Sequence, residues 1–363
     1  MKNVLGNNVT VTLFGESHGT AIGAVIDGIS PGIKVDEDFI RYQLELRRPA
    51  GDISTPRSEA DNFIIHSGVF NGYTTGTPIC IIIPNEDTKS KDYSDIKNKM
   101  RPGHADFTSL AKYGGFADYR GGGHFSGRIT AAIVAAGAIA VSALRNKDIL
   151  IGTHILRCAN ISDSPFGDYE KDIVSLNSKR YAVINDRVAE DMKKAIIMAK
   201  SEGDSVGGVL ETAVTGIPAG VGEPWFDTVE SMLSHALFSV PAVKGVEFGA
   251  GFSIADMYGS QANDEFYFDG EKVRTKTNNN GGINGGITNG MPIVFRCAVK
   301  PTPTIHKLQH TIDVESKENI EFIAGGRHDP AIVHRARVVV DSITALVICD
   351  ILAGRYGTDW LVK

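Results

Sequence analysis

An unbroken apolar segment near the middle of the chain constrains the fold most strongly. Residues 130–144 read TAAIVAAGAIAVSAL, with small or aliphatic side chains at almost every position. A helix that is apolar all round must be buried on every side. Its longest purely apolar run, residues 131–141, is well short of the ~20 residues that span a bilayer. We therefore expect a core helix with β-sheets packed outside it.

Residue patterns outside this segment predict the layers around it. Stretches rich in β-branched residues predict strands at residues 9–14, 21–27, 63–69, 78–83, 149–159, 209–214 and 293–299. Apolar residues at helical spacing predict helices at residues 36–46, 185–201, 224–238 and 331–352. Residues 162–174 are predicted to form a loop.

A pattern G-x-T-x-G-x-P-I occurs twice, at residues 72–79 and 286–293, each time leading into a predicted strand. A repeat at this separation fits two related structural halves, although shared turn chemistry would also explain it. We predict an α/β (α+β) fold: a single large domain over residues 1–363, with buried helices between antiparallel β-sheets and internal pseudo-symmetry.

Charge and composition exclude several classes of function. The net charge of −6 and the pI near 5.9 argue against a nucleic-acid or membrane-surface protein, which needs a broad basic face. The first residues, MKNVLGNNVT, lack a signal-peptide core, so we expect a cytoplasmic protein. Neither a disulfide framework nor a zinc site is expected, because no C-x-x-C pair is formed by Cys80, Cys158, Cys297 and Cys349.

Residues 101–130, RPGHADFTSLAKYGGFADYRGGGHFSGRIT, hold the densest cluster of glycines and titratable side chains. A glycine-dense turn lets backbone N–H groups approach a ligand, and the start of a helix favours an anion. The stretch therefore indicates a phosphate site, unless it is a surface loop whose charges are simply solvated. Its titratable residues are His104, Asp106, Lys112, Asp118, Arg120, His124 and Arg128.

A second motif, Gly15-Glu16-Ser17-His18-Gly19, follows the first predicted strand. Its G-x-S-x-G spacing also occurs in the nucleophile elbow of hydrolases, but an elbow leads into a helix. Here residues 21–27 predict another strand, so we expect a hairpin tip that presents Ser17 and His18. A histidine at such a tip can protonate a phosphoryl oxygen, or it can merely cap the turn.

Other polar segments could line the same pocket. Four arginines, whose forks suit carboxylates and phosphates, fall at Arg41, Arg47, Arg48 and Arg57. Residues 275–290 are either a flexible loop or a ligand cradle, and residues 325–330 can supply an anion clamp and a general base. We find no H-E-x-x-H, no Walker A lysine and no dinucleotide fingerprint, so neither a metal site nor a standard nucleotide-binding module is predicted.

The ordered set of motifs resembles the chorismate synthase family over nearly the whole chain. The matching segments are residues 15–19, 47–49, 74–76, 101–106, 112–114, 118–123, 203–205, 300–302 and 327–330. The resemblance implies a lyase that uses reduced FMN (FMNH2) to convert 5-enolpyruvylshikimate 3-phosphate to chorismate and phosphate. This trans 1,4-elimination is the last common step of the shikimate pathway toward aromatic amino acids. The flavin is thought to lend an electron while phosphate leaves.

The resemblance also implies partners. It predicts a homotetramer with a small-molecule substrate. Some family members reduce their own flavin, with NADPH, and others depend on outside reduction. Since no separate nicotinamide-binding fingerprint is visible, we expect an external flavin reductant.

Residue roles follow from the same resemblance. It implies that His18 protonates the departing phosphate, that His104 lies near the N1/C2 carbonyl region of the flavin, and that Asp329 acts with flavin N5 in removing the C6 proton. The implied substrate contacts are Ser17, Arg47, Arg48 and Arg128. The implied cofactor contacts are His124, Phe125, Ser126, Pro241, Ala242, Gly285, Lys300, Pro301, Thr302, Pro303, Thr304 and Arg327.

The chain departs from the family pattern in several places, among them residues 127–130, which read GRIT where Ala-Arg-Glu-Thr is common. His124-Phe125 stands where arginine and serine are common, and Pro241 replaces a common asparagine. The loop after Arg48 is one residue short, which leaves Arg57 only a candidate counterpart of a second family arginine. Two alternatives therefore stay open: a phosphate-ester hydrolase that uses His18 and His104, and a noncatalytic phosphometabolite-binding protein.

Overall fold

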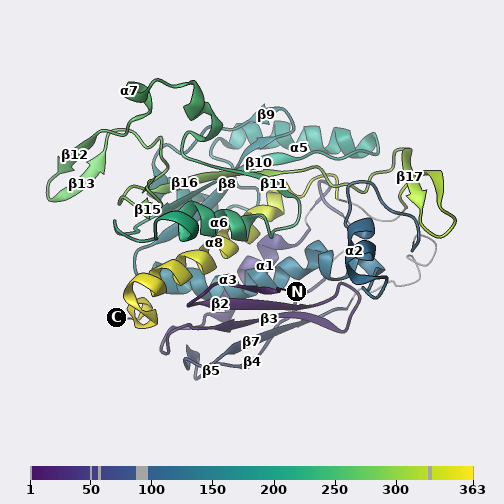
Figure 1. The fold of residues 1–363 in the computed structure, drawn as a ribbon, viewed down its shortest axis with the longest axis horizontal. Coiled ribbons are helices and arrows are strands. Elements are labelled where there is room, and N and C mark those ends of the chain that lie inside the picture. Colours follow the sequence, from purple (N-terminus) through teal and green to yellow (C-terminus); the bar gives the residue numbers. More distant parts are fainter. Residues whose placement is uncertain (1, 50, 56–58, 87–96, 326–328, 363) are drawn as a thin grey trace.

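Two five-stranded antiparallel sheets enclose a layer of helices in the computed structural model (Figure 1), which describes residues 2–49, 51–55, 59–86, 97–325 and 329–362. The first sheet has the strand order β1 (Val4–Leu5), β2 (Thr10–Gly15), β3 (Ala21–Asp27), β7 (Ile79–Pro84), β4 (Ile64–Ser67). The second has the order β11 (Val243–Phe248), β16 (Ile293–Val299), β10 (Gly208–Thr215), β8 (Leu150–Cys158), β9 (Ile161–Ser162).

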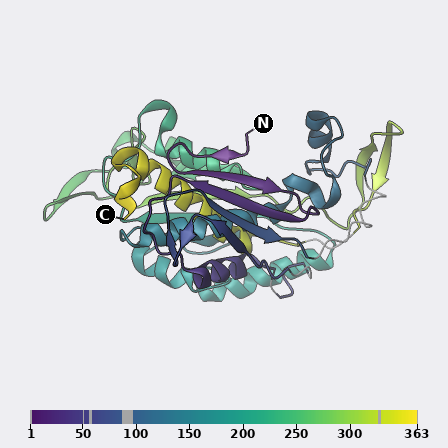
Figure 2. The ribbon, with the colours of Figure 1, turned by 90° about the horizontal axis from the view of Figure 1, so that it is seen from below.

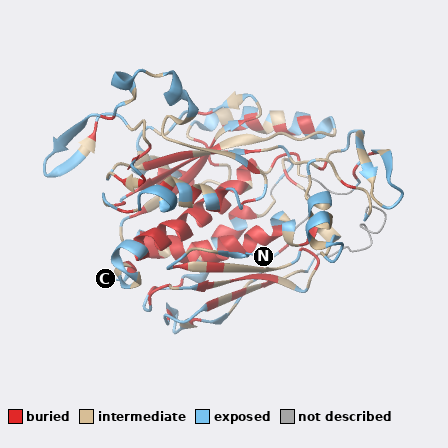
Figure 3. Ribbon diagram, viewed as in Figure 1, coloured by how far each residue is buried: buried red, intermediate tan, exposed pale blue. Residues whose placement is uncertain are grey.

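Helices α3 (Thr130–Arg145) and α8 (Val333–Tyr356) pack against each other between the sheets (Figure 3). Every residue of α3 except Ser142 and Arg145 is buried, which confirms the predicted core helix. Gly137 allows the two helices to touch, because a Cβ there would lie 2.6 Å from the Cα of Ser342. The stretch Gly127–Arg145 is long and apolar enough to cross a membrane, but it is buried inside the protein.

The two halves of the chain repeat one topology. Strands β2, β3, β7 and β4 lie side by side in the first sheet as β8, β10, β16 and β11 do in the second. Helix α1 (Glu37–Arg47) packs on α3, and α6 (Val229–Leu237) packs on α8. The structure thus confirms the predicted sandwich and its pseudo-symmetry.

The repeated G-x-T-x-G-x-P-I pattern has one structural meaning in both halves. Its threonines end the hairpins β5 (Val69–Phe70)–β6 (Tyr73–Thr74) and β14 (Ile283–Asn284)–β15 (Ile287–Thr288). Thr74 Oγ1 donates to the Ser30 carbonyl (2.6 Å) and accepts the Ile33 N–H (2.9 Å). Thr288 Oγ1 makes the same two bonds, to the Pro218 carbonyl (2.7 Å) and from the Val221 N–H (2.9 Å). Each threonine ties its hairpin to the turn after the sheet's third strand.

Two predicted boundaries are wrong. Residues 162–174 are not a loop throughout, because α4 (Tyr169–Asn177) begins there, capped by the Asp168 carboxylate and held by the buried Ile173. The helix predicted from residue 224 begins only at Val229, since Trp225 has a positive φ and Thr228 provides the N-cap. The predicted helix at residues 185–201 forms as α5 (Asp186–Ser201), with Asn185 as its N-cap.

The remaining elements project from the ends of the sandwich. Figure 2 shows α2 (Asp106–Tyr113) and the hairpin β17 (Gln309–Asp313)–β18 (Glu318–Phe322) at one end of the molecule. The hairpin β12 (Phe266–Asp269)–β13 (Lys272–Thr275) extends from the opposite end, near the short α7 (Gly259–Ala262).

Candidate functional site

Ser17 and His18 lie in the turn between β2 and β3, so the motif forms the expected hairpin tip rather than a nucleophile elbow. Both are buried, with His18 8% exposed. The glycine run of residues 121–123 lies against this tip. The Ser17 N–H donates to the Gly123 carbonyl (3.1 Å), and the His124 ring is 2.8 Å from the Gly15 carbonyl. Since a carbonyl only accepts, Nδ1 of His124 carries the hydrogen.

Two neighbouring glycines place the run between two histidines. A Cβ on Gly121 would overlap the His18 ring and lie 2.9 Å from Ser17 Oγ, and a Cβ on Gly122 would lie 3.3 Å from Cε1 of His104. Both glycines have positive φ, 58° and 82°. The backbone can therefore approach both rings only because side chains are missing here.

Ser17 Oγ is a polar atom without a partner at this tip. It is buried and has no hydrogen bond to any described residue. Buried hydroxyls are nearly always paired, so an orphaned one beside a buried histidine indicates a place for a ligand.

His104 is oriented by the start of α2. Its Nδ1 lies 2.8 Å from Oδ1 of Asp106, whose carboxylate also receives Nε and Nη2 of Arg101 (2.7 and 2.8 Å). Burial disfavours the charged carboxylate, but the bonds from Arg101 and His104 outweigh burial and hold the pKa of Asp106 well below its usual range. The Asp106 carboxylate accepts the hydrogen on Nδ1 of His104, so Nε2 is the ring nitrogen that remains for a ligand.

Arg47, the last residue of α1, is fixed against the start of α3. Its Nε donates to Thr130 Oγ1 (2.9 Å), and its Nη2 donates to the Gly127 carbonyl (2.7 Å). Burial lowers the pKa of this guanidinium to about 10, because a charge is disfavoured away from water. Arg47 therefore remains a cation near neutral pH.

Arg128, in the turn before α3, connects the arginines to the hairpin tip. Its Nε donates to Oδ1 of Asn85 (3.1 Å), and Nδ2 of Asn85 donates to the carbonyls of Glu16 (2.9 Å) and Gly19 (3.0 Å). Those two residues flank Ser17 and His18, so Arg128 and the tip share one polar network.

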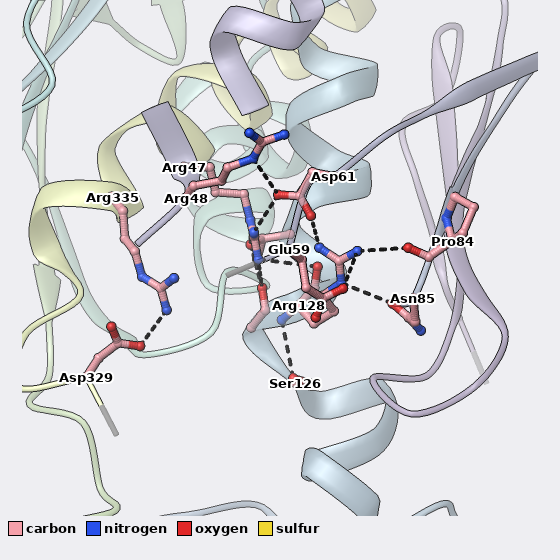
Figure 4. Close-up of polar contacts among 12 residues, drawn as sticks. Arg47, Arg48, Glu59, Asp61, Pro84, Asn85, Ser126, Arg128, Asp329 and Arg335 are labelled. Atoms are coloured by element: carbon pink, nitrogen blue, oxygen red, sulfur yellow. Dashed lines mark hydrogen bonds and ion pairs between the residues drawn. The ribbon is translucent and has the colours of Figure 1, made fainter. Parts of the chain in front are cut away.

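Two acidic residues form ion pairs with the arginines (Figure 4). Asp61 pairs with Arg128 and is also 3.6 Å from Arg47 and 3.8 Å from Arg48; Glu59 pairs with Arg128 at 3.0 Å. The carboxylate of Asp61 is 1% exposed, and its φ is +53°. Among the described residues, three cations and two anions leave this cluster one positive charge in excess.

Asp329 lies just before α8, close to the same cluster (Figure 4). Its Oδ1 accepts the Thr55 N–H (3.0 Å), and its Oδ2 accepts Nη2 of Arg335 (2.6 Å). Arg335 lies near enough to Arg47 for the repulsion between the two positive charges to lower the pKa of Arg47. The carboxylate and the arginines therefore share one electrostatic environment.

The segment of residues 300–304 packs beside His104. Nζ of Lys300 donates to the Gly103 carbonyl (2.5 Å), and the Lys300 N–H donates to the carbonyl of Ala242 (2.9 Å). Oγ1 of Thr302 is buried and has no hydrogen-bond partner among the described residues. This segment thus has a cation and an unsatisfied hydroxyl next to the His104 turn.

Comparisons with known proteins agree on one family. A family model described as chorismate synthase matches residues 9–353. The chorismate synthase of Pyrococcus abyssi is 47% identical over 350 residues, 96% of this chain and 97% of that protein. That of Methanosarcina barkeri is 45% identical over 349 residues, covering 96% and 95%. The chain belongs to the chorismate synthase family. A crystal structure of chorismate synthase shares its fold, with a TM-score of 0.77 and 30% identity over 97% of this chain and 94% of that one.

The family assignment gives no support to the hydrolase or to the noncatalytic binder. Within the part of the chain that the structure describes, no group of three or more His, Cys, Asp or Glu side chains could hold a metal ion.

The residues expected to contact flavin in a chorismate synthase are brought together only in part. Ala242 and residues 300–304 lie beside the His104 turn, and Pro241 directly precedes Ala242. Gly285 lies in the β14–β15 hairpin, at the end of the sandwich away from α2 (Figure 1). Arg327 lies outside the described residues, as does Arg57.

These residues fit a flavin. The ring and phosphate of FMN need hydrogen-bond donors, and Thr302 supplies an orphaned hydroxyl next to the cation of Lys300. The departure at His124 and Phe125 is compatible with this site, because His124 is held by Gly15 and Phe125 packs edge-on against Tyr113 with 6.0 Å between ring centres. Ser126 accepts the Arg128 N–H through its hydroxyl (3.3 Å).

Sequence reasoning missed four residues of the site. Asn85, Glu59 and Asp61 link or balance the arginines, and Arg335 holds Asp329. Glu59 and Asp61 follow an arginine-rich segment closely, and this proximity could have predicted that they neutralise part of its charge. Nothing local signals that Asn85 meets the hairpin tip.

Proposed function

We propose that this protein is a carbon–oxygen lyase that forms chorismate and phosphate from 5-enolpyruvylshikimate 3-phosphate by a reduced-FMN-dependent trans 1,4-elimination. One observation carries the proposal most directly. A buried serine with an orphaned hydroxyl and a buried histidine share a hairpin tip, and a glycine run separates that tip from a second, carboxylate-oriented histidine.

The hairpin tip is suited to the departing phosphate. His18 would give a proton to the phosphate oxygen that leaves C3, and Ser17 Oγ would donate a hydrogen bond to the substrate. General acid catalysis lowers the barrier because the leaving group departs with less negative charge. The burial of His18 supports this role, since little water competes for the proton there.

The arginine cluster is suited to the substrate's anionic groups. Arg47 and Arg128 are held rigidly by backbone and side-chain partners, so they would bind without first being ordered. Glu59 and Asp61 reduce the positive charge, and the remaining excess would attract the substrate. Arg48, a third of whose side chain is exposed, is the most accessible of the three arginines.

Reduced FMN would supply transient one-electron chemistry when bound. The residues that would hold it are Ala242, Lys300, Thr302 and Thr304, with His104 next to them, directly after Gly103 in the chain. Because Asp106 fixes the proton on Nδ1 of His104, Nε2 is available to manage charge on the cofactor.

Asp329 would receive the proton that leaves C6. Its carboxylate is partly buried and lies in the same electrostatic environment as the substrate arginines. A base near bound anions must be held in place, because the substrate repels it.

We also propose that the protein is a homotetramer that depends on an external source of reduced flavin. Exposed aromatic side chains support an assembly, since large apolar surfaces mark interaction sites. They lie between α6 and β13, at Phe238, Phe252, Tyr258, Phe266 and Phe268.

The test is direct. The purified protein is incubated with 5-enolpyruvylshikimate 3-phosphate and dithionite-reduced FMN, and chorismate and phosphate are both measured. We expect the two products in equal amounts and none without reduced FMN. Phosphate release without FMN would favour a hydrolase, and no release under any condition would favour a binding protein.

A further inference from the structure

Both carboxylate oxygens of Asp329 accept a hydrogen bond. Oδ1 accepts the backbone N–H of Thr55 (3.0 Å), and Oδ2 accepts Nη2 of Arg335 (2.6 Å). The side chains of Asp329 and Arg335 are only 11% and 20% exposed. One donor on each oxygen leaves the carboxylate little freedom to rotate. Figure 4 shows the contact with Arg335.

The two donors differ in kind. Thr55 belongs to the segment that continues toward Asp61, whereas Arg335 lies in the first turn of α8, a helix that is buried over most of its length. The Arg335 N–H donates to the Ile332 carbonyl (3.1 Å), which fixes its backbone. Arg335 is therefore the rigid partner, and Asp329 lies in the turn just before that helix.

An alternative role for Arg335 is direct binding of a substrate anion, since Arg47 is nearby. The contact with Asp329 argues against it. At 2.6 Å this is a short, charge-assisted hydrogen bond, and a ligand that recruited Nη2 would have to break it and leave a partly buried carboxylate without its counter-charge.

We propose that Arg335 is a positioning residue for the elimination: it fixes the orientation of the Asp329 carboxylate toward the substrate hydrogen that is removed. This inference rests on the proposed function. It assigns to Arg335 an effect on the chemical step and not on substrate binding.

The expected signature is a loss in kcat with KM preserved. Arg335→Ala lets the carboxylate rotate, and misplacement of a reacting group costs ~10- to 100-fold in rate. We expect KM to stay within about threefold. With substrate deuterated at C6, the isotope effect on kcat should rise, because proton removal becomes slower relative to the other steps. Arg335→Lys keeps a charge and a donor without the planar fork, so it should recover part of the loss.

A double-mutant cycle separates positioning from an independent role. If Arg335 acts through Asp329, then Arg335→Ala should cause little further loss in an Asp329→Asn background, with residual turnover followed at high enzyme concentration. Arg355→Ala, at the exposed end of the same helix, serves as the matched control and should match the unsubstituted enzyme.

Several outcomes would overturn the inference. A raised KM with unchanged kcat would make Arg335 a substrate ligand, and full additivity with Asp329→Asn would make its effect independent of that carboxylate. If Arg335→Ala does not fold, Arg335→Lys carries the same measurements. If the unsubstituted protein makes no chorismate with reduced FMN, the proposed function fails, and this inference fails with it. If the unsubstituted protein is active and Arg335→Ala has the same kcat, the inference alone fails.

Discussion

Gly121 lies directly against the ring of His18, with no room for a Cβ between them. Its φ of +58° is also a conformation that costs an L-residue about 1–2 kcal/mol. We expect Gly121→Ala to displace the His18 ring and to lower kcat by ~10²-fold or more. Steady-state chorismate formation and the melting temperature should both be measured.

Gly127→Ala is the matched control for that variant. Gly127 belongs to the same glycine-rich stretch, but a Cβ there would meet nothing within 4 Å, and its φ is not positive. Activity and melting temperature should stay close to those of the unsubstituted protein. Equal losses of activity in the two variants would mean that activity depends on the glycine-rich stretch in general and not on the contact between Gly121 and His18.

His18→Ala removes the proposed general acid. If His18 protonates the departing phosphate, turnover should fall by about 10²- to 10⁴-fold, while binding of reduced FMN should change little. The first is measured by chorismate formation and the second by fluorescence or calorimetric titration. Unchanged turnover would remove His18 from the mechanism.

Asp61→Ala should destabilise the fold through the arginines that it leaves behind. Removing one partner of a buried ion pair typically costs about 3–5 kcal/mol, and Asp61 faces both Arg47 and Arg128 in that environment. Asp61→Asn should cost less, because asparagine tolerates a positive φ and still accepts a hydrogen bond. Urea denaturation gives the free energies of unfolding.

Asp38→Ala is the surface control for Asp61. Asp38 pairs with Arg41, but both side chains are largely exposed, so its loss should change the free energy of unfolding by less than about 1 kcal/mol. An equally small change in the free energy of unfolding for Asp61→Ala would show that water reaches the arginine cluster in solution.

Stability should also depend on a buried histidine remote from the site. His154 lies between Asp163 (3.3 Å) and Glu211 (3.0 Å). Burial alone would lower its pKa, but these two hydrogen-bonded carboxylates outweigh burial and raise it. A raised pKa in the folded state adds stability that is complete below the unfolded value of about 6.5 and is lost as pH rises through the folded value.

We therefore expect the melting temperature to fall as pH rises above about 6.5, and this part of the fall to disappear in His154→Gln. The pH dependence contributed by Asp163 has the opposite sign, because the pKa of this carboxylate is lowered in the folded protein. Burial would raise that pKa, but hydrogen bonds from His154 and from backbone N–H groups outweigh burial. Its contribution is present above the unfolded value of about 3.9 and is lost as pH falls. An unchanged slope in His154→Gln would assign the alkaline loss to other groups.

Local patterns predicted the parts of the fold that local chemistry determines. The all-round apolar composition of residues 130–144 requires burial, and two strands on either side of residues 16–20 require a hairpin. The helix at Tyr169 was missed because its capping aspartate and polar first turn resemble a loop. Family motifs identified Asp329 but not its backbone donor Thr55, which is 274 residues away along the chain.

The arginine cluster illustrates the same limit. Arg47, Arg48 and Arg128 could be predicted as an anion site from residue type and family motif. That Asp61 turns back onto them depends on a single residue with positive φ, a conformation that composition does not predict. The flavin contact predicted for Gly285 stays a prediction, since that residue belongs to the β14–β15 hairpin, at the end of the sandwich away from α2.

The contact between α3 and α8 sets an order of events during synthesis. Helix α3 is complete by residue 145, but the helix that covers it ends at residue 356 of a 363-residue chain. The first sheet and its central helix are therefore synthesised well before α8, and until then the face of α3 that α8 covers lacks its native partner. Such surfaces are prone to aggregate, so this half must wait for the last helix, or be shielded by a chaperone, before it can become native.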